Sequence, residues 1–598
     1  MASLGEDDAP AAPVKGVIAR NAAEYSLEQP EVVVVGAGTA GATMAITLAR
    51  QGRKVVLIER NLEEVDRIVG ELLQPGGLRS LENLGLDECA KDGCDSVVVN
   101  GYTIILPPNE RYPEGMETLL YYPERDPSNA AEFFGKGVVP RAQGKSQEVP
   151  RGRSFHNSKF VQRLRQAAQQ EPNVQVIEGT VTKLVEENGV VVGVDYKVTE
   201  EGAEKKVLKT LRAPLTVVAD GIWSGLRKCS NSNKPHGIST FVGVVVDHPH
   251  MEAPVPSPYC GHVILAQPSP ILIYQISPTE TRVLVDVMGK VPSAATGDLC
   301  RFLKHQAQYM PDVFRDSYLR AVRDDNIKSM PNRALPSASK VSLTKLHPNV
   351  GATPLECFSL SLFRYACSFR FMLHPLLLIF SLPSHLLASV LAFPLLQHKP
   401  GTILIGDALN MRHPLTGGGM TVAIKDVELA CGLLEELNFQ DHVAMAAMVK
   451  RFHSERMHAT TINVLANALY DVFSTPEGES QAIRGYLMCA CFEYLNMGGL
   501  CAAGPVGLLS GLTPKPWVLT THFFMVAFYA MRQHLLPFGF LNPLALLRVY
   551  RILHVACMII MPLLVLEGSN STPLAWWPIR KLINLAFPYE RMLDQWKE

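Results

Sequence analysis

The sequence lacks the marks of several classes of protein. It contains no tract of lysine and arginine, and 56 basic against 57 acidic residues give a formal net charge of -1, so its charge does not favour nucleic acid as a partner. Its twelve cysteines include no C-x-x-C pair, which is typical of a reduced, cytosol-facing protein rather than a disulfide framework. Residues 1–30 contain no long apolar run, so we expect a flexible tail there rather than a signal peptide or a membrane span.

Apolar residues are abundant in this chain. Hydrophobic residues make up 47% of the 598 residues and charged residues only 19%, and this length predicts two to four domains. The most apolar part follows residue 474, where long runs such as residues 552–566 predict helices. That run is short for a membrane-spanning helix of roughly twenty residues, so we expect in-plane association with a membrane, with a span and a buried helix pair as the alternatives.

A βαβ unit stands near the start of the sequence. Residues 32–35 and 55–58 are short apolar runs typical of buried parallel strands, and residues 42–50 between them have helical character. The first connection has the pattern G-x-G-x-x-G, and the second strand ends on an acid that can bind a ribose hydroxyl. This combination predicts dinucleotide binding, with a pyrophosphate on the helix N-terminus, and the residues concerned are Gly36, Gly38, Gly41 and Glu59.

The stretch DRIVGELLQPGG follows this unit. Pro75, Gly76 and Gly77 predict a turn before a helix, and by themselves Arg67 and Glu71 predict an exposed ion pair. Further on, residues 151–170 predict a loop leading into a helix that carries Arg163 and Arg165, and alternating residues from 174 to 198 predict antiparallel strands. A buried strand ends at Asp220, and residues 271–287 predict a hairpin.

The most unusual stretch is GDALNMRHPLTGGGM, residues 406–420. A strand over residues 402–405 precedes it and a helix from about Met420 follows it. Three consecutive glycines do not fill a core, so this loop predicts a close approach of the backbone to a ligand.

In their order, the motifs GAGTAG, ER, DRIVGELLQPGG, GRSFH, ADG and GDALNMRHPLTGGGM resemble the FAD-dependent monooxygenases related to aromatic hydroxylases. The longer motifs are similar to those of the squalene monooxygenase (squalene epoxidase) family. This resemblance implies an α/β + α fold: a Rossmann-type FAD-binding domain, an interleaved β-rich substrate domain and a C-terminal apolar helical region that associates with a membrane. The expected division of the chain is 1–30 tail; 31–100, 151–235 and 398–473 FAD-binding domain; 101–150 and 236–340 substrate domain; 341–397 atypical apolar insertion; and 474–598 membrane-association region.

The resemblance also implies which residues bind the cofactor and substrate. Tyr102 and Gln74 match a pair beside the flavin in the substrate pocket, and Asp407 matches the acid that binds the ribityl and pyrophosphate part of FAD. His413 is expected to fix its loop by a hydrogen bond, with a role as catalytic acid as the alternative, and His156 and His262 are expected to be structural. The full set of expected cofactor-binding residues is Gly36, Gly38, Thr39, Ala40, Gly41, Glu59, Arg60, Arg67, Arg165, Val181, Asp220, Gly406, Asp407, Pro414, Gly417, Gly418, Gly419 and Met420.

The implied activity is epoxidation of squalene to (S)-2,3-epoxysqualene in sterol biosynthesis, with FAD, O2 and electrons from NADPH. Epoxidation of an unactivated alkene needs no general base, so we expect neither a catalytic triad nor a metal site, but we do expect exclusion of water. Because the sequence has one dinucleotide fingerprint, electrons are expected from a partner protein, and the resemblance implies that this partner is an NADPH-cytochrome reductase. The implied location is the cytosolic side of the endoplasmic reticulum or microsomal membrane, in contact with membrane lipid, with lipid droplets as an alternative.

Residues 341–397 depart from this family, which has a short connection at that place. The segment is very apolar without clear periodicity. It is either a membrane hairpin or a retained intron. The second interpretation rests on possible splice sites: Val341 and Ser342 can be encoded GTGAGT, which resembles a splice donor, and Gln397 can be encoded CAG, the usual end of a splice acceptor. Two alternatives to squalene epoxidation stay open: a flavin monooxygenase of another lipid or terpenoid, which the pocket residues alone do not exclude, and a paralogue inactivated by the insertion.

Overall fold

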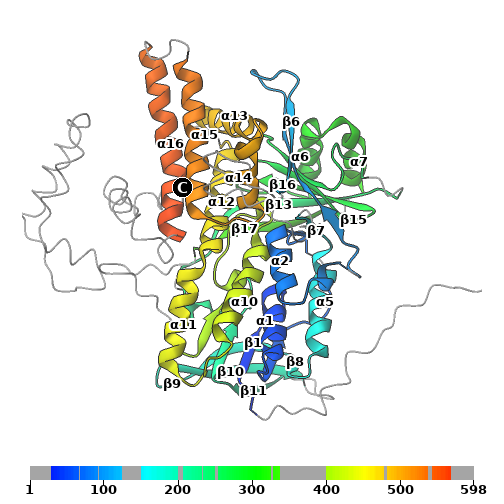
Figure 1. Ribbon diagram of the computed structural model, residues 1–598. Coiled ribbons are helices and arrows are strands. Elements are labelled where there is room, and N and C mark those ends of the chain that lie inside the picture. Colours follow the sequence, from blue (N-terminus) through cyan, green and yellow to red (C-terminus); the bar gives the residue numbers. More distant parts are fainter. Residues whose placement is uncertain are drawn as a thin grey trace, which may run out of the picture.

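The computed structural model describes residues 29–65, 67–91, 93–123, 150–199, 206–231, 233–249, 253–324, 327–336, 399–476, 481–536 and 542–567. The expected N-terminal tail, except for its last two residues, and the insertion at residues 341–397 lie outside these ranges. Figure 1 shows a lower layer around one sheet, an upper layer around a second sheet, and a group of helices at one side.

The lower layer is built on a parallel sheet of five strands in the order β18-β12-β1-β2-β8. Its central strand is paired in register on both sides, with Val32 opposite Val55 and Leu215. The central strands β1 and β2 are apolar runs without polar alternation because both faces of the sheet are covered there, whereas the edge strand β8 is only half-buried. Their bounds are β1 Val32–Val35, β2 Val55–Glu59, β8 Val174–Glu178, β12 Leu215–Val218 and β18 Thr402–Leu404.

Alternate residues of β1 contact different layers. Val32 and Val34 pack into a core with the helices, whereas Val33 and Val35 pack against Val194 and neighbours in a small antiparallel sheet. This small sheet has the order β11-β10-β9. Its strands are β9 Thr180–Glu187, β10 Val190–Thr199 and β11 Lys206–Arg212, and the helices on the other face are α1 Thr39–Arg50, α5 Asn157–Gln170 and α10 Gly419–Leu434.

The upper layer is a seven-stranded sheet in the order β17-β13-β16-β15-β14-β5-β6. Val242 and Val244 on one face pack with helices α6 and α7, while Phe241 on the other face packs with the C-terminal helices. The predicted hairpin is confirmed as β15 and β16. The bounds are β5 Gly101–Leu106, β6 Met116–Tyr121, β13 His236–Asp247, β14 Cys260–Ile264, β15 Ile271–Ser277, β16 Glu280–Val287, β17 Ile327–Ala334, α6 Asp298–Gln306 and α7 Asp312–Arg323.

A small three-stranded sheet and a short helix join the two layers. The sheet has the order β3-β7-β4, and β3 is formed by the two leucines inside the DRIVGELLQPGG motif. The elements are β3 Leu72–Leu73, β4 Val97–Val99, β7 Gly152–Ser154, α2 Pro75–Asn83 and α3 Glu88–Lys91.

The turn predicted at Pro75, Gly76 and Gly77 is wrong, because these residues form the first turn of α2. Proline is tolerated at the first helical position, where its missing N–H has no partner in the helix anyway. The glycines permit close packing instead: Gly76 N donates to Ser510 O at 2.8 Å, and a Cβ on Gly76 would lie 2.3 Å from Gly511 O. The motif is therefore a docking point for the C-terminal helices.

The C-terminal helices stand together beside the upper sheet, with α15 and α16 as the outer pair (Figure 1). The helix predicted over residues 552–566 is longer than expected: α16 begins at Pro543, and its segment Pro543–Leu564 is long and apolar enough to span a membrane. Pro562 lies inside the helix and does not end it. These helices are α12 Met457–Phe473, α13 Gln481–Asn496, α14 Gly499–Leu509, α15 Pro516–Leu535 and α16 Pro543–Glu567, whereas α11 His442–Glu455 packs beside α10 in the lower layer (Figure 1).

The predicted exposed pair of Arg67 and Glu71 is also wrong. Glu71 is 1% exposed and pairs across the layers with buried Arg282, whose Nη2 lies 2.8 Å from Glu71 Oε1. Tyr274 donates a further hydrogen bond of 2.9 Å to the same carboxylate. Burial raises the pKa of Glu71, against the opposing charge of Arg282. Sequence proximity suggested the wrong partner because the true one is 211 residues away.

We expect Glu71→Gln to lower the free energy of unfolding by about 3–5 kcal/mol, since it leaves a buried guanidinium without its counter-charge. Chemical denaturation of the purified protein measures this change. The control is Arg451→Gln, which breaks an exposed pair with Glu455 and should cost at most about 1 kcal/mol. A Glu71 variant as stable as the control variant would contradict the assignment.

Candidate active site

Most of the expected cofactor-binding residues follow the carboxyl ends of the parallel strands. Because the five strands run in the same direction, these ends lie at one edge of the sheet. In the spatial order of the strands, the residues at or beyond these ends are Asp407, Asp220, the turn Gly36–Gly41 (here the nucleotide turn), Glu59 with Arg60, and Val181. The topology therefore brings together five segments that lie far apart in the sequence.

The nucleotide turn shows why its glycines are there. Gly36 has φ +101°, and a Cβ on Gly41 would lie 1.8 Å from Gly36 O. The backbone conformation and packing therefore require glycine at both positions, independently of any ligand. A Cβ on Gly38 would meet no described atom within 4 Å, and Gly38 has ordinary extended φ and ψ. No described side chain caps α1 at Gly38. Its first N–H groups and the open space above Gly38 therefore fit an anionic pyrophosphate, with Thr39 and Ala40 in the same turn.

Glu59 and Arg165 hold the nucleotide turn from one side. Glu59 Oε2 accepts a hydrogen bond from Ala37 N at 2.7 Å, and Arg165 Nε donates to Ala37 O at 2.9 Å. Burial lowers the pKa of Arg165, and the charge of Arg67 lowers it further. Arg60 and Arg67 are both exposed. Arg67 lies close enough for its charge to act on Arg165, but its side chain is not buried in the site.

The two acids beyond the nucleotide turn differ in environment. Burial raises the pKa of Asp220, and its Oδ1 has no hydrogen-bond partner among the residues that the structure describes. Asp407 is exposed and follows Gly406, which has φ +60° and lies close to Ala40. A buried carboxylate oxygen without a partner and an exposed acid at the same edge fit the hydroxyl donors of a dinucleotide.

The segment Gly406 to Met420, here the glycine loop, is held from several sides. Asn231 donates to Leu409 O at 3.0 Å, Met411 pairs with Leu335, and Asn467 accepts from His413 N at 3.1 Å. These partners come from three different parts of the chain, so the loop conformation depends on the whole fold.

His413 contributes to fixing the glycine loop. Its Nδ1 accepts a hydrogen bond from Leu415 N at 3.2 Å, and its ring stacks on Tyr470 with centroids 3.8 Å apart. Ser239 Oγ lies 3.1 Å from Nε2 on the other side. Burial lowers the pKa of His413. The ring of His413 is fully buried and neutral, and both of its nitrogens have partners. These properties favour the role of fixing the loop by a hydrogen bond over the role of a catalytic acid.

The three consecutive glycines have different surroundings, which corrects the expectation that all three make room for the cofactor. Gly417 has φ +61° and ends a short helical turn that begins at Pro414. A Cβ on Gly418 would lie 2.6 Å from Ile462 Cγ2, so this glycine is needed for packing. Only at Gly419 would a Cβ meet no described atom within 4 Å. Gly419 begins α10, followed by buried Met420, and no side chain in the described part of the chain caps that helix.

We expect Gly418→Ala and Gly419→Ala to separate these roles. Gly418→Ala should lower the free energy of unfolding by about 1–3 kcal/mol, as overpacking does, because its methyl group overlaps Ile462. Gly419→Ala should leave the cofactor-free protein as stable as the parent but weaken FAD binding. Denaturation of the apoprotein and FAD titration measure the two effects, and the reverse pattern would contradict the assignment.

Gln74 joins the glycine loop to the upper sheet. Its Oε1 accepts hydrogen bonds from Tyr102 at 2.6 Å and from Tyr122 at 2.9 Å, and its Nε2 donates to Thr416 O at 2.9 Å. Burial raises the pKa of both tyrosines, which keeps their hydroxyls protonated. The pair of Tyr102 and Gln74 expected from the sequence is in contact, whereas Tyr122, which follows β6 and has no motif around it, was missed.

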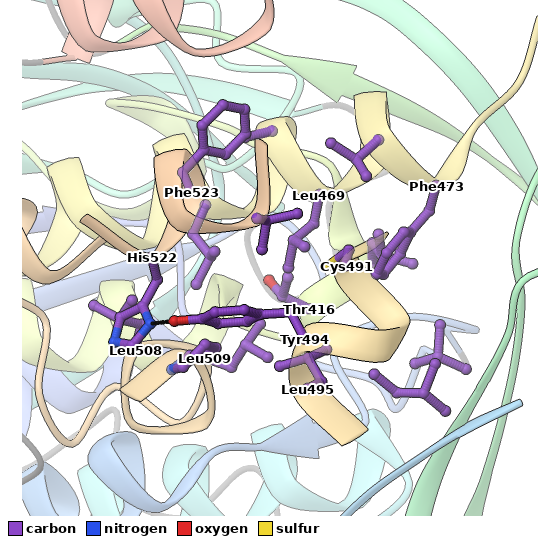
Figure 2. Close-up of a pocket in the computed structure, with 18 of the residues that line it drawn as sticks. Thr416, Leu469, Phe473, Cys491, Tyr494, Leu495, Leu508, Leu509, His522 and Phe523 are labelled. Atoms are coloured by element: carbon purple, nitrogen blue, oxygen red, sulfur yellow. Dashed lines mark hydrogen bonds between the residues drawn. The ribbon is translucent and has the colours of Figure 1, made fainter. Parts of the chain in front are cut away.

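An apolar pocket lies between β5, β6 and the C-terminal helices. Thr416 of the glycine loop and Tyr102 belong to its wall, and Figure 2 shows leucine and phenylalanine side chains around it. The polar pair Tyr494 and His522 is hydrogen-bonded at 2.8 Å, and burial lowers the pKa of His522 to about 4. The other lining residues are Ile104, Leu120, Val263, Leu415, Leu465, Ala468, Leu469, Val472, Phe473, Leu487, Cys491, Leu495, Pro505, Leu508, Leu509, Leu519, Phe523 and Val526.

The two other histidines singled out in the sequence lie outside this pocket wall. His156 Nε2 lies 2.7 Å from Glu280 Oε2, and His262 Nε2 accepts from Ser257 N at 3.3 Å. Burial lowers the pKa of His262 to about 4. Both therefore have contacts of a structural kind.

Solved structures with the same fold include flavin enzymes. The flavin-dependent brominase Bmp2 aligns with a TM-score of 0.51 at 14% identity, covering 84% of this chain and all of that chain. Klebsiella pneumoniae HpxO complexed with FAD and uric acid aligns with a TM-score of 0.50 at 14% identity, covering 80% of this chain and 96% of that one. Residues 31–64 also match the FAD binding domain family, so the cofactor of the lower layer is FAD.

Curated relatives match nearly the whole chain. Squalene epoxidase 3 of Arabidopsis thaliana is 40% identical over 545 residues, covering 90% of this chain and 85% of that protein. The squalene monooxygenase of Mus musculus is 36% identical, covering 90% of this chain and 78% of the relative, and squalene epoxidase erg1 of Aspergillus fumigatus is 34% identical, covering 90% and 94%. Residues 212–345 and 385–547 match the family model described as squalene epoxidase. The chain belongs to the squalene epoxidase family.

Proposed function

We infer that this chain is an FAD-dependent monooxygenase that converts squalene to (S)-2,3-epoxysqualene, a step of sterol biosynthesis. The observation that carries this inference is the contact between two sites. Thr416 belongs to the glycine loop at the carboxyl edge of the parallel sheet and also to the wall of the apolar pocket. A hydrocarbon in the pocket is thereby held against the place where the loop approaches the cofactor. The squalene epoxidase and monooxygenase names of the relatives support the same substrate.

FAD is assigned along the carboxyl edge, with its pyrophosphate on the nucleotide turn. The glycines of that turn, Thr39 and Ala40 offer N–H groups, and Glu59, Arg60 and Val181 lie at the adenosine end. Asp220 and Asp407 would accept hydrogen bonds from FAD hydroxyls next to the pyrophosphate, such as those of the ribityl part, and Arg67 and Arg165 would supply positive charge. The flavin end would lie along the loop from Gly406 through Pro414 and Gly417 to Met420, with Gly419 as the open position and Gly418 packed against Ile462.

In the reaction, bound FAD supplies oxygen activation. One atom of O2 enters the epoxide and the other leaves as water, while NADPH and a proton provide two electrons and two protons. Tyr102 and Gln74 orient the glycine loop beside the alkene, and neither is required to move a proton, since Tyr102 is held protonated. The leucine and phenylalanine side chains of the pocket exclude water from the reacting alkene.

The proposed partners follow from the substrate and the C-terminal helices. Squalene dissolves in membranes rather than water, and exposed apolar side chains on α16 suit contact with membrane lipid, among them Leu544, Leu547 and Tyr550. We place the protein on the cytosolic side of the endoplasmic reticulum or microsomal membrane, where an NADPH-cytochrome reductase would supply electrons.

We also propose the domain division given by the sequence and assign residues 341–397 to a retained intron. The family match leaves out residues 346–384, which lie inside this segment, and this gap supports an insertion that the family pattern lacks. On both sides the chain is part of the fold, through Leu335 paired with Met411 and Lys399 paired with Glu186. Sequencing the mature transcript tests this proposal, and a dominant message that contains the segment would contradict it.

The test of the function uses the purified full chain in phospholipid vesicles with FAD, NADPH, an NADPH-cytochrome reductase and squalene. We expect 2,3-epoxysqualene to form and to disappear when any component is left out. Absence of epoxide from protein that carries FAD, with oxidation of another alkenyl lipid in the same assay, would favour the alternative substrate. Protein that cannot retain FAD would favour an inactive paralogue.

A further inference from the structure

A buried carboxylate lies behind the glycine loop, on the side of the upper sheet. Asp286 on β16 is 4% exposed, and its hydrogen-bond donors are uncharged side chains. Ser239 Oγ and Asn332 Nδ2 donate to its Oδ1, the latter at 3.2 Å, and Tyr470 Oη donates to its Oδ2 at 2.9 Å. His413 Nε2 lies 3.6 Å from the same Oδ1. Strands β13 and β17 and helix α12 therefore hold a carboxylate close to the histidine of the loop.

The hydrogen bonds of this network determine where each proton lies. A carboxylate only accepts, so the hydroxyl proton of Ser239 is used on Asp286, and the two N–H bonds of Asn332 Nδ2 are used on Asp286 and Ser239. The lone pairs of Ser239 Oγ remain for two donors. One donor is Asn332 Nδ2 at 2.9 Å, and the other is His413 Nε2 at 3.1 Å. His413 therefore carries a proton on Nε2.

The other ring nitrogen of His413 holds the glycine loop. Nδ1 accepts from Leu415 N at 3.2 Å and thereby caps the short helical turn Pro414–Thr416. A neutral imidazole with its proton on Nε2 has its lone pair on Nδ1, as this bond requires, whereas the other tautomer would turn an N–H toward the N–H of Leu415. The ring stacks on Tyr470 with centroids 3.8 Å apart and lies 5.4 Å from the ring of Phe241, so packing keeps it in this orientation.

We propose that Asp286 is a positioning residue for the flavin site: through Ser239 it keeps the proton of His413 on Nε2, so that Nδ1 holds the turn Pro414–Thr416 of the glycine loop. The inference deepens the proposed function and rests on its placement of the flavin end of FAD along this loop. It gives the upper sheet a part in cofactor binding, since Asp286 and Ser239 belong to β16 and β13. A carboxylate suits this role because hydrogen bonds to a charged acceptor are roughly twice as strong as those to a neutral one.

The test compares Asp286→Asn with Asp247→Asn, an exposed acid at the end of β13 that serves as the control. Asparagine has nearly the shape of aspartate without its charge, so the acceptor of Ser239 is weakened while the packing is kept. FAD affinity of the purified full chain is measured by flavin fluorescence, and visible circular dichroism reports the flavin environment. For Asp286→Asn we expect FAD to bind about tenfold more weakly, with an altered circular dichroism spectrum, and for the control we expect no change.

The same change in a His413→Asn background separates a role through His413 from a merely structural one. The side-chain oxygen of asparagine can accept from Leu415 N, as it does at helix N-termini, but this shorter side chain ends before it reaches Ser239. In that background we expect Asp286→Asn to change neither FAD affinity nor the circular dichroism spectrum any further. A tenfold loss of affinity in both backgrounds would overturn the proposal.

The ¹⁵N spectrum of histidine-labelled protein reads the position of the proton directly. We expect a protonated Nε2 and an unprotonated Nδ1 for His413 in the parent protein, and a mixture of both tautomers in Asp286→Asn. If that variant does not fold, Ser239→Ala takes its place, because it leaves Asp286 two of its three donors. An unchanged FAD affinity or an unchanged tautomer in the folded variant would contradict the proposal. These measurements need no squalene, so a failure of the proposed substrate would show only in turnover.

Discussion

Replacement of Gly38 by valine should abolish tight FAD binding in a protein that still folds. The added side chain meets no described atom within 4 Å of its Cβ, and the extended φ and ψ of Gly38 suit valine. It would occupy the space above the first N–H groups of α1, and loss of about two charge-assisted hydrogen bonds costs about 3–6 kcal/mol, or roughly 10²–10⁴-fold in affinity. FAD titration of the apoprotein measures this loss.

The control for Gly38→Val is Gly237→Val. Gly237 lies on β13, and its Cβ likewise would meet no described atom within 4 Å. The control variant should bind FAD like the parent. Gly38→Val itself should lose only about 1 kcal/mol of apoprotein stability, as expected for valine at the position that precedes a helix. A Gly38→Val protein that binds FAD normally would exclude the nucleotide turn as the pyrophosphate site.

Replacement of Gln74 by leucine should reduce epoxide formation strongly while FAD stays bound. The change leaves the hydroxyls of Tyr102 and Tyr122 and the carbonyl oxygen of Thr416 without their buried partner. Each such group costs about 1–3 kcal/mol, and about 3 kcal/mol expressed at the glycine loop corresponds to a roughly hundredfold lower rate. Steady-state epoxide formation measures it, together with the epoxide formed per NADPH oxidised.

The control for Gln74→Leu is Gln51→Leu. Gln51 also donates one hydrogen bond to a backbone oxygen, that of Cys431 at 3.1 Å, but lies at the end of α1 away from the carboxyl edge. The control should keep parental turnover. If Gln74→Leu turns squalene over at the parental rate, the link between the glycine loop and the pocket has no functional role.

Local sequence patterns correctly predicted the βαβ unit, whose strands, helix and turn are specified by residues close together in the sequence. The run Val32 to Val35, the glycines after it and Glu59 are contiguous enough to specify a βαβ unit, and they lie as expected at the carboxyl edge. The pair of Tyr102 and Gln74 came from the family resemblance, and the structure places it in contact. Its third member, Tyr122, has no local signal because its partner Gln74 is 48 residues away.

The wrong predictions share one cause, which is packing between distant segments. The local sequence of Pro75, Gly76 and Gly77 suggests a turn, but in the structure these residues pack against Ser510 and Gly511. The local sequence around Glu71 suggests an exposed side chain, but in the structure Glu71 pairs with Arg282 of the upper sheet. Three glycines in a row suggested one purpose, but the space beside each is set by different neighbours. Such contacts are a property of the tertiary fold and cannot be read from residues close in sequence.

The central claim is that FAD at the carboxyl edge and squalene in the apolar pocket meet at the glycine loop. The most direct measurement is a single turnover of the FAD-loaded protein, reduced under argon and mixed with squalene and ¹⁸O₂, with mass spectrometry of the product. The account predicts one ¹⁸O atom in 2,3-epoxysqualene from the parent protein, and loss of that product in Gln74→Leu with FAD still bound. Reoxidation of the parent flavin without any labelled epoxide, under conditions where squalene is bound, would contradict it.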